Sequence, residues 1–113
     1  MKYTISVICL LLCFNLCYSQ RLKTPTLSPF SKISQQVGLT DVTLEYSRPS
    51  AKGRVVFGEL VPYNKVWRTG ANAATKITFK EVAKIGGKTI QPGEYAIYTI
   101  PGEDLWTIII HSN

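Results

Sequence analysis

The sequence has 113 residues, 13 basic and seven acidic side chains, a formal net charge of +6 and three cysteines. That length is enough for one modest domain and not for two. The basic residues are scattered singly along the chain, so they support weak attraction to anionic surfaces and argue against a nucleic-acid-binding face.

Residues 1–19 are predicted to be a secretory signal peptide. Small residues, Cys17 and Ser19, stand at the −3 and −1 positions before Gln20. The apolar run after Lys2 spans about a dozen residues, fewer than the roughly 20 that a membrane-spanning helix needs. We therefore expect cleavage after Ser19, export to the periplasm or beyond the cell, and no stable membrane insertion afterwards. An uncleaved anchor is the alternative.

All three cysteines lie in this leader, so the mature chain would contain no thiol. Disulfides, thiolate zinc sites and cysteine nucleophiles are therefore excluded, and neither a metal nor a cofactor is expected. The mature chain would keep 94 residues (113 − 19), with twelve basic and seven acidic side chains. Its stability must come from its core alone.

The domain is predicted to begin after a linker or extended arm, residues 20–30, which is rich in proline, threonine and serine and has no periodicity. A short strand over residues 31–37 ends at Gly38. Residues 41–47 then alternate between apolar and polar side chains, as a half-buried strand does. The two strands are expected to form a hairpin that opens a β-rich domain over residues 31–113.

The segment over residues 53–79 is predicted to organise the domain. The apolar spacing within residues 57–61 predicts one helical turn, which Pro62 ends. Residues 63–73 are expected to form an ordered loop held by Trp67, because an indole of that size is rarely left wholly exposed.

Alternating strands resume over residues 74–80, and Gly86-Gly87 predicts a hairpin turn, because glycine takes the positive φ angles that such turns require. Residues 94–100 and 105–111 are apolar on both faces. Strands of that kind lie in the middle of a sheet or under a second layer.

These patterns predict an all-β fold, an antiparallel sandwich or a partly closed barrel. The chain stops three residues after Ile110, at the end of its most apolar strand. A strand this hydrophobic is expected to have partners on both edges. We therefore expect the fold to be truncated at the C-terminus.

Three motifs, YSRPSAKGR, VPYNKVWRTGANAAT and PGEYAIYTIPGEDLWTIII, resemble those of a bacterial family known as domain of unknown function 2911, or DUF2911. The resemblance covers residues 28–110. It implies a secreted or periplasmic protein with no established activity, so no catalytic residue carries over. Members of the family look longer, which implies that this chain holds the N-terminal part of such a domain.

Four side chains are candidate ligand-binding residues: Arg54, Trp67, Arg68 and Asn72. A guanidinium group binds a carboxylate or phosphate through two hydrogen bonds, and aromatic faces beside amides suit a saccharide. The alternative is structural. Arg68 and Asn72 would then only hold the backbone of their own loop, with Trp67 filling the core.

No catalytic constellation is recognisable. His111 is the sole histidine, and the glutamates are spread over different elements, so neither a serine–histidine pair nor a pair of facing carboxylates is indicated. The sequence favours a non-catalytic domain that binds a small molecule, a saccharide or a protein, or that serves structurally. A hydrolase acting on cell-envelope or imported polymer, with catalytic residues partly in a missing C-terminal half, is the alternative.

Overall fold

The computed structural model describes residues 21–112 of the chain. These residues contain seven β-strands and no helix. The predicted signal peptide and its cleavage site lie outside these residues. Residues 21–29 lead into the first strand without regular secondary structure. The strands are β1 (Phe30–Val37), β2 (Thr40–Ser47), β3 (Thr75–Phe79), β4 (Ala83–Ile85), β5 (Lys88–Ile90), β6 (Gly93–Ile100) and β7 (Thr107–Ser112).

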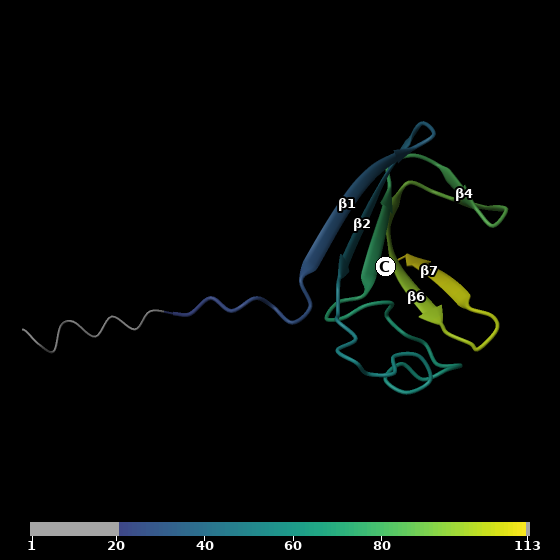
Figure 1. The fold of residues 1–113 in the computed structure, drawn as a ribbon. Coiled ribbons are helices and arrows are strands. Elements are labelled where there is room, and N and C mark those ends of the chain that lie inside the picture. The colour runs from purple at the N-terminus through teal and green to yellow at the C-terminus, as the bar shows by residue number, and fades with distance from the viewer. Residues whose placement is uncertain (1–20, 113) are drawn as a thin grey trace, which may run out of the picture.

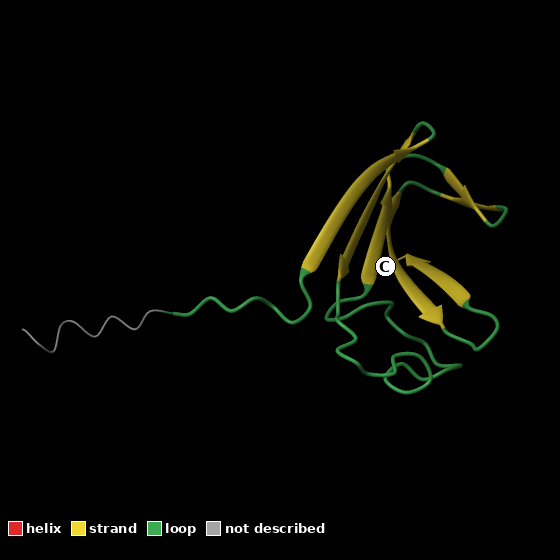
Figure 2. Cartoon of the chain, viewed as in Figure 1, coloured by secondary structure: helices red, strands yellow, loops and turns green. Residues whose placement is uncertain are grey.

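Five of the strands form one curved sheet in the order β1-β2-β3-β6-β7, and all its neighbours are antiparallel (Figure 1). The remaining two, β4 and β5, form a separate hairpin that leans out from one end of this sheet (Figure 2). The predicted all-β antiparallel class is confirmed. Within the described residues the fold is sandwich-like, with sheets of five and two strands, and the strands do not close into a barrel.

Both predicted hairpins form. β1 and β2 pair along their whole length, from Phe30 opposite Ser47 to Val37 opposite Thr40. β4 and β5 are joined at Gly86-Gly87, whose φ angles of 55° and 78° lie in the left-handed region that glycine enters without steric cost.

The predicted helical turn over residues 57–61 is wrong. Gly58 has a φ of 94°, which a right-handed helix cannot accommodate. The segment is a tight turn instead. Its closing hydrogen bonds run from the Val61 N–H to the Val56 carbonyl, at 2.7 Å, and from the Gly58 N–H to the Val61 carbonyl, at 2.9 Å. Apolar spacing over five residues did not distinguish this turn from a helix.

The strand register gives the sheet one apolar face. Ile33, Leu44, Ile77 and Tyr95 form a single row across β1, β2, β3 and β6, because residues directly opposite each other on paired strands share a face. Ile33 remains 45% exposed. A second layer does not cover this end of the row within residues 21–112.

Ion pairs stabilise strand pairing on the opposite face. They join β1 to β2, β3 to β6, and the end of β3 to β2; the pairs are Lys32–Glu45, Lys76–Glu94 and Lys80–Asp41. Exposed pairs of this kind contribute little to stability, because water and salt screen their charges. Three of the seven acidic residues of the chain therefore form ion pairs on the sheet.

The two apolar strands lie in different places. β6 is central, between β3 and β7, as predicted. β7 pairs only with β6 among the described residues and forms an edge of the sheet, with Ile108 67% exposed. The apolar character of a strand thus indicated its interior position for β6 and not for β7.

The most buried side chains gather where the sheet meets the long segment between β2 and β3. Five of the six described residues that expose 8% or less of their surface lie there: Val61, Thr75, Ala96, Thr99 and Pro101. The sixth, Phe79, lies at the other end of β3. Three of the five come from β6 and the residue that follows it. Most of the core therefore lies at the end of the sheet where this segment packs, and it positions the candidate site.

Candidate functional site

The segment between β2 and β3, residues 48–74, spans 27 residues (74 − 48 + 1) without a regular strand or helix. We call it the β2–β3 connection. It winds across one end of the sheet, below the strands in the view of Figure 1. Connections this long without secondary structure are uncommon in compact domains, and they are usually either functional or disordered.

Backbone hydrogen bonds attach the β2–β3 connection to β6. Trp67 and Thr99 form an isolated antiparallel bridge, with N–O distances of 2.7 and 2.9 Å. The last pair between β3 and β6 is Thr75 opposite Ile97, so Trp67 continues the β3 side of β6 two residues further. The Asn64 N–H also donates to the Pro101 carbonyl at 2.7 Å. The predicted ordered loop is therefore an extension of the sheet.

Three threonine side chains fix the middle of the connection. Thr69 Oγ1 lies 3.0 Å from Thr99 Oγ1, and the Thr75 hydroxyl donates to the Thr69 carbonyl at 2.6 Å. Thr69 has a φ of 57°, a costly conformation for a β-branched residue. Such strain persists only where the surroundings impose it, and it is common at binding sites.

All four non-glycine residues with positive φ in the described part of the chain lie in the β2–β3 connection: Lys52, Asn64, Thr69 and Asn72. Asparagine tolerates the left-handed region better than most residues, whereas lysine and threonine gain nothing from it. The path of this connection is therefore set by its contacts and not by local preference.

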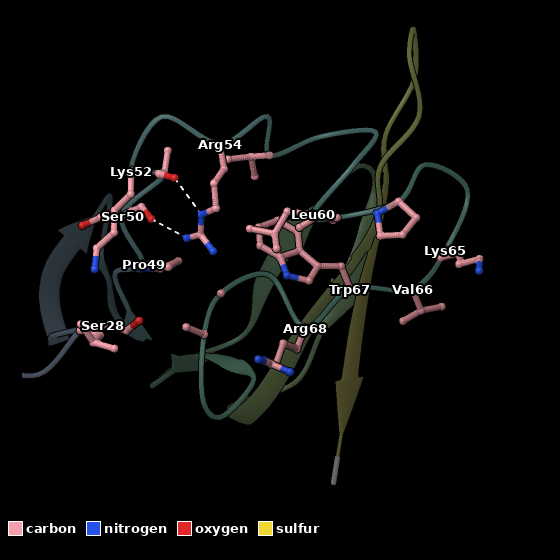
Figure 3. Close-up of a pocket in the computed structure, with 17 residues that line it drawn as sticks. Ser28, Pro49, Ser50, Lys52, Arg54, Leu60, Lys65, Val66, Trp67 and Arg68 are labelled. Atoms are coloured by element: carbon pink, nitrogen blue, oxygen red, sulfur yellow. Dashed lines mark hydrogen bonds between the residues drawn. The ribbon is translucent and has the colours of Figure 1, made fainter.

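A cavity of about 840 Å³ lies under the connection. Its wall is formed by Leu27 and Ser28 of the N-terminal arm and by three stretches of the connection, within residues 49–56, 60–62 and 65–71. We call it the loop cavity. Three of the four predicted ligand-binding residues line it: Arg54, Trp67 and Arg68 (Figure 3).

Arg54 is held by its own loop. Its Nε donates to the Ala51 carbonyl and its Nη2 donates to the Ser50 carbonyl, each at 2.9 Å, as the dashed lines in Figure 3 mark. Arg68 is exposed and makes no hydrogen bond or ion pair with its side chain within residues 21–112. The loop backbone therefore holds the side chain of Arg54 and not that of Arg68, a difference that the sequence did not predict.

Asn72 lies outside the wall of the loop cavity. Its side-chain amide donates to Ser47 Oγ at 3.3 Å and so connects the β2–β3 connection to the end of β2. The structural alternative expected Asn72 to hold the backbone of its own loop, whereas the contact in the structure is with a side-chain hydroxyl at the end of β2.

Trp67 is half-buried and belongs to a cluster of three aromatic rings. Its ring centroid lies 5.9 Å from that of Phe57 and 6.5 Å from that of Trp106, and the Phe57 and Trp106 centroids are 4.8 Å apart, all edge to face. Such pairs add about 0.5–1.5 kcal/mol beyond the area that they bury. The sequence analysis missed Phe57 and Trp106, because their contact joins distant segments and leaves no local pattern.

The ionisable side chains in the wall of the loop cavity are all basic: Lys52, Arg54, Lys65 and Arg68. The sequence analysis did not single out the two lysines. A signal was available, because residues 48–74 contain five basic residues and one acidic residue, Glu59, a formal charge of +4.

Other candidate chemistry lies away from this cavity. His111 is exposed on β7, opposite Ala96 of β6. Glu45 and Glu94 face lysines in the ion pairs of the sheet. Between residues 21 and 112, no three His, Cys, Asp or Glu side chains are placed to hold a metal ion. The same residues include no helical segment with the length and hydropathy that a membrane crossing requires.

The fold and the site define an all-β domain with a cavity under a long, fixed connection. The chain belongs to the family described as Protein of unknown function (DUF2911), whose model matches residues 28–113. The resemblance in the motif VPYNKVWRTGANAAT is thereby confirmed. No curated protein and no solved structure matches the chain.

Proposed function

We propose that this protein is an exported, non-catalytic β-domain that binds a small molecule or saccharide in the loop cavity. The observation that carries the proposal is the cavity itself, about 840 Å³ in volume with Trp67 and two arginines in its wall. Small-molecule sites are typically concave, largely preformed and about 300–1,000 Å³ in volume.

The fixed path of the β2–β3 connection supports this proposal. The Trp67–Thr99 bridge, the threonine hydrogen bonds and the carbonyl bonds of Arg54 hold the wall in one conformation before any ligand arrives. Binding then costs less conformational entropy than it would in a mobile loop. Strain at Thr69 is consistent with a wall that is shaped for binding.

The character of the wall favours binding over hydrolysis. A hydrolase needs a nucleophile beside a general base, or an acid and a base that face each other. The ionisable side chains of the wall are four basic residues, which can hold a ligand in place but do not form such a pair. No contact in the described residues favours the hydrolase alternative.

Export forms part of the proposal and rests on residues 1–19, with their apolar run and the small residues Cys17 and Ser19. The exported protein should begin at Gln20. Intact-mass measurement of the secreted form tests this, and a species that retains residues 1–19 would contradict it.

Binding in the loop cavity can be tested by filling the cavity. Ala71 lines it, whereas Ala73, in the same connection, does not. Ligand-detected NMR would screen aromatic acids, neutral aromatics, monosaccharides and disaccharides against the protein. We expect hits that Ala71→Phe abolishes and Ala73→Phe preserves. Absence of hits, or hits that survive Ala71→Phe in a folded protein, would contradict the proposal.

A further inference from the structure

We infer that the ligand of the loop cavity is a small amphipathic anion, with a carboxylate or phosphate at one end and an apolar body. This inference rests on the proposed function and specifies its ligand class. Three features of the cavity support it. These are its unbalanced positive charge, a guanidinium group that is already oriented, and a volume too large for an inorganic ion beside a largely apolar wall.

The charge around the cavity is unbalanced. The three ion pairs in the described residues all belong to the sheet, at Lys32, Lys76 and Lys80. The four basic side chains of the cavity wall form none within residues 21–112. Like charges around one concave surface raise its positive potential, which an anion lowers by binding.

Arg54 is the oriented donor. Its bonds to the Ser50 and Ala51 carbonyls occupy Nε and Nη2 and fix the plane of the guanidinium group. Nη1 makes no hydrogen bond within residues 21–112, so its two N–H groups can donate to a ligand oxygen. An oriented guanidinium loses less side-chain entropy when it binds an anion than a mobile one does.

Arg68 and Lys65 complement Arg54. Both are exposed side chains in the cavity wall, and neither is required by a hydrogen bond or ion pair within the described residues. Figure 3 shows Lys65 on the other side of Trp67 from the two guanidinium groups, so Arg68 is the one of the two that lies nearer to Arg54. The Arg68 charge can therefore approach a bound anion without breaking an existing contact. Hydrogen bonds to charged groups are stronger than those between neutral groups, so this contact is expected to matter when the anion is present.

Most of the rest of the wall is apolar. Val56, Leu60, Val61, Pro62 and Trp67 contribute to it, and Val61 is only 8% exposed. A cavity of about 840 Å³ is of the size that holds a drug-sized molecule, far larger than one phosphate ion. The apolar body of the ligand would lie against these side chains, with its charge directed toward the arginines.

Isothermal titration calorimetry with three probes tests this inference: 2-naphthoate, its neutral analogue 2-naphthamide, and inorganic phosphate. We expect 2-naphthoate to bind about tenfold more tightly than 2-naphthamide, a difference equal to one charge-assisted hydrogen bond. Phosphate should bind more weakly than 2-naphthoate, and added salt should weaken 2-naphthoate binding because the site is open to solvent.

Arg68→Gln tests the charge without removing an internal contact, and Lys84→Gln is its matched control. Lys84 lies on β4, in the hairpin that leans out from the end of the sheet, and the substitution changes the net charge equally (Figure 1). Arg68→Gln should weaken 2-naphthoate binding about tenfold, and Lys84→Gln should leave it unchanged.

The outcomes separate this inference from the proposed function. Equal binding of 2-naphthoate and 2-naphthamide would overturn the anionic ligand and leave a ligand-binding cavity. Phosphate binding as tight as that of 2-naphthoate would overturn the apolar body. If Lys84→Gln weakened binding as much as Arg68→Gln, the attraction would be nonspecific and the inference wrong. Failure of all three probes to bind would overturn this inference alone, because the proposed small-molecule or saccharide site is tested separately by the ligand screen against Ala71→Phe.

Discussion

Trp67 and Thr99 exchange backbone hydrogen bonds of 2.7 and 2.9 Å, so that an irregular connection extends the hydrogen-bond pattern between β3 and β6 by one pair. Beyond Thr75, where β3 begins, β6 would otherwise present an open edge on that side. The bridge at Trp67 covers this edge and places the indole in the wall of the loop cavity. One contact thus completes the sheet and shapes the candidate site.

Trp67→Ala should destabilise the protein by about 2–4 kcal/mol, somewhat less than the roughly 3–5 kcal/mol of fully buried aromatic truncations, because the indole is half-buried. The substitution removes edge-to-face contacts with Phe57 and Trp106. Urea unfolding followed by circular dichroism measures the change. Trp67→Phe, which keeps an aromatic ring, should cost clearly less, and an unfolding midpoint for Trp67→Ala equal to that of the parent would show that the indole has no structural role.

Arg54→Lys should lower the free energy of unfolding by about 0.5–1.5 kcal/mol, because an ammonium group cannot reproduce the forked bonds to the Ser50 and Ala51 carbonyls. Arg68→Lys is the control, and it should leave stability within about 0.5 kcal/mol of the parent because Arg68 makes no such bond. Thermal unfolding of both variants decides the matter. Equal losses would mean that Arg68 also holds the connection.

Gly58→Ala should destabilise the turn before Val61 more than Gly38→Ala destabilises the first hairpin. Both glycines have positive φ, 94° and 62°. A Cβ at Gly58 would lie 2.9 Å from Tyr63 Cε2, whereas a Cβ at Gly38 has open space around it. We expect about 1–3 kcal/mol for Gly58→Ala and about 1 kcal/mol for Gly38→Ala. The comparison separates contact from backbone strain, and denaturation midpoints in the reverse order would refute it.

Stability should fall in acid in a way that depends on Glu45. A hydrogen bond from Lys32 holds the pKa of this carboxyl below its ordinary value of 4.5. A lowered folded-state pKa means that the contribution of Glu45 to stability is complete above the ordinary value and is lost as the pH falls through the lowered one. Glu45→Gln should therefore flatten the loss of stability below about pH 4.5.

The contribution of Lys76 to stability should be lost at high pH, the opposite direction to that of Glu45. A hydrogen bond to Glu94 raises the pKa of Lys76 above its ordinary value of 10.5, so its contribution is complete below that value and is lost as the pH rises further. Melting temperatures between pH 2 and 11 measure both arms of the curve. Glu81→Gln, at an exposed residue outside the three ion pairs, is the control and should leave both arms unchanged.

Local patterns were sufficient to predict most of the strands. Alternation in β2 and β3 and the paired glycines before β5 depend only on neighbouring residues, so the sequence reveals them directly. The order of the strands depends on distant contacts. β6 pairs with β3 across the β4–β5 hairpin, and the position of β7 at an edge could not be inferred from its composition.

The candidate site divides in the same way. Trp67, Arg54 and Arg68 could be selected by residue type within one conspicuous motif, and all three line the loop cavity. Their separate contacts could not be foreseen. The bonds of Arg54 depend on the exact path of the loop before it, and the contact between Phe57 and Trp106 depends on how the connection packs beside β7.

Because the amides of Trp67 and Thr99 share one bridge, the connection cannot lift from the sheet without breaking hydrogen bonds of β6. Transient opening of the cavity wall is thereby linked to fraying of a central strand, and the two amides exchange their hydrogens with solvent through a common event. A ligand that fills the cavity would slow that event, and its protection would extend to β6, beyond the residues that the ligand contacts.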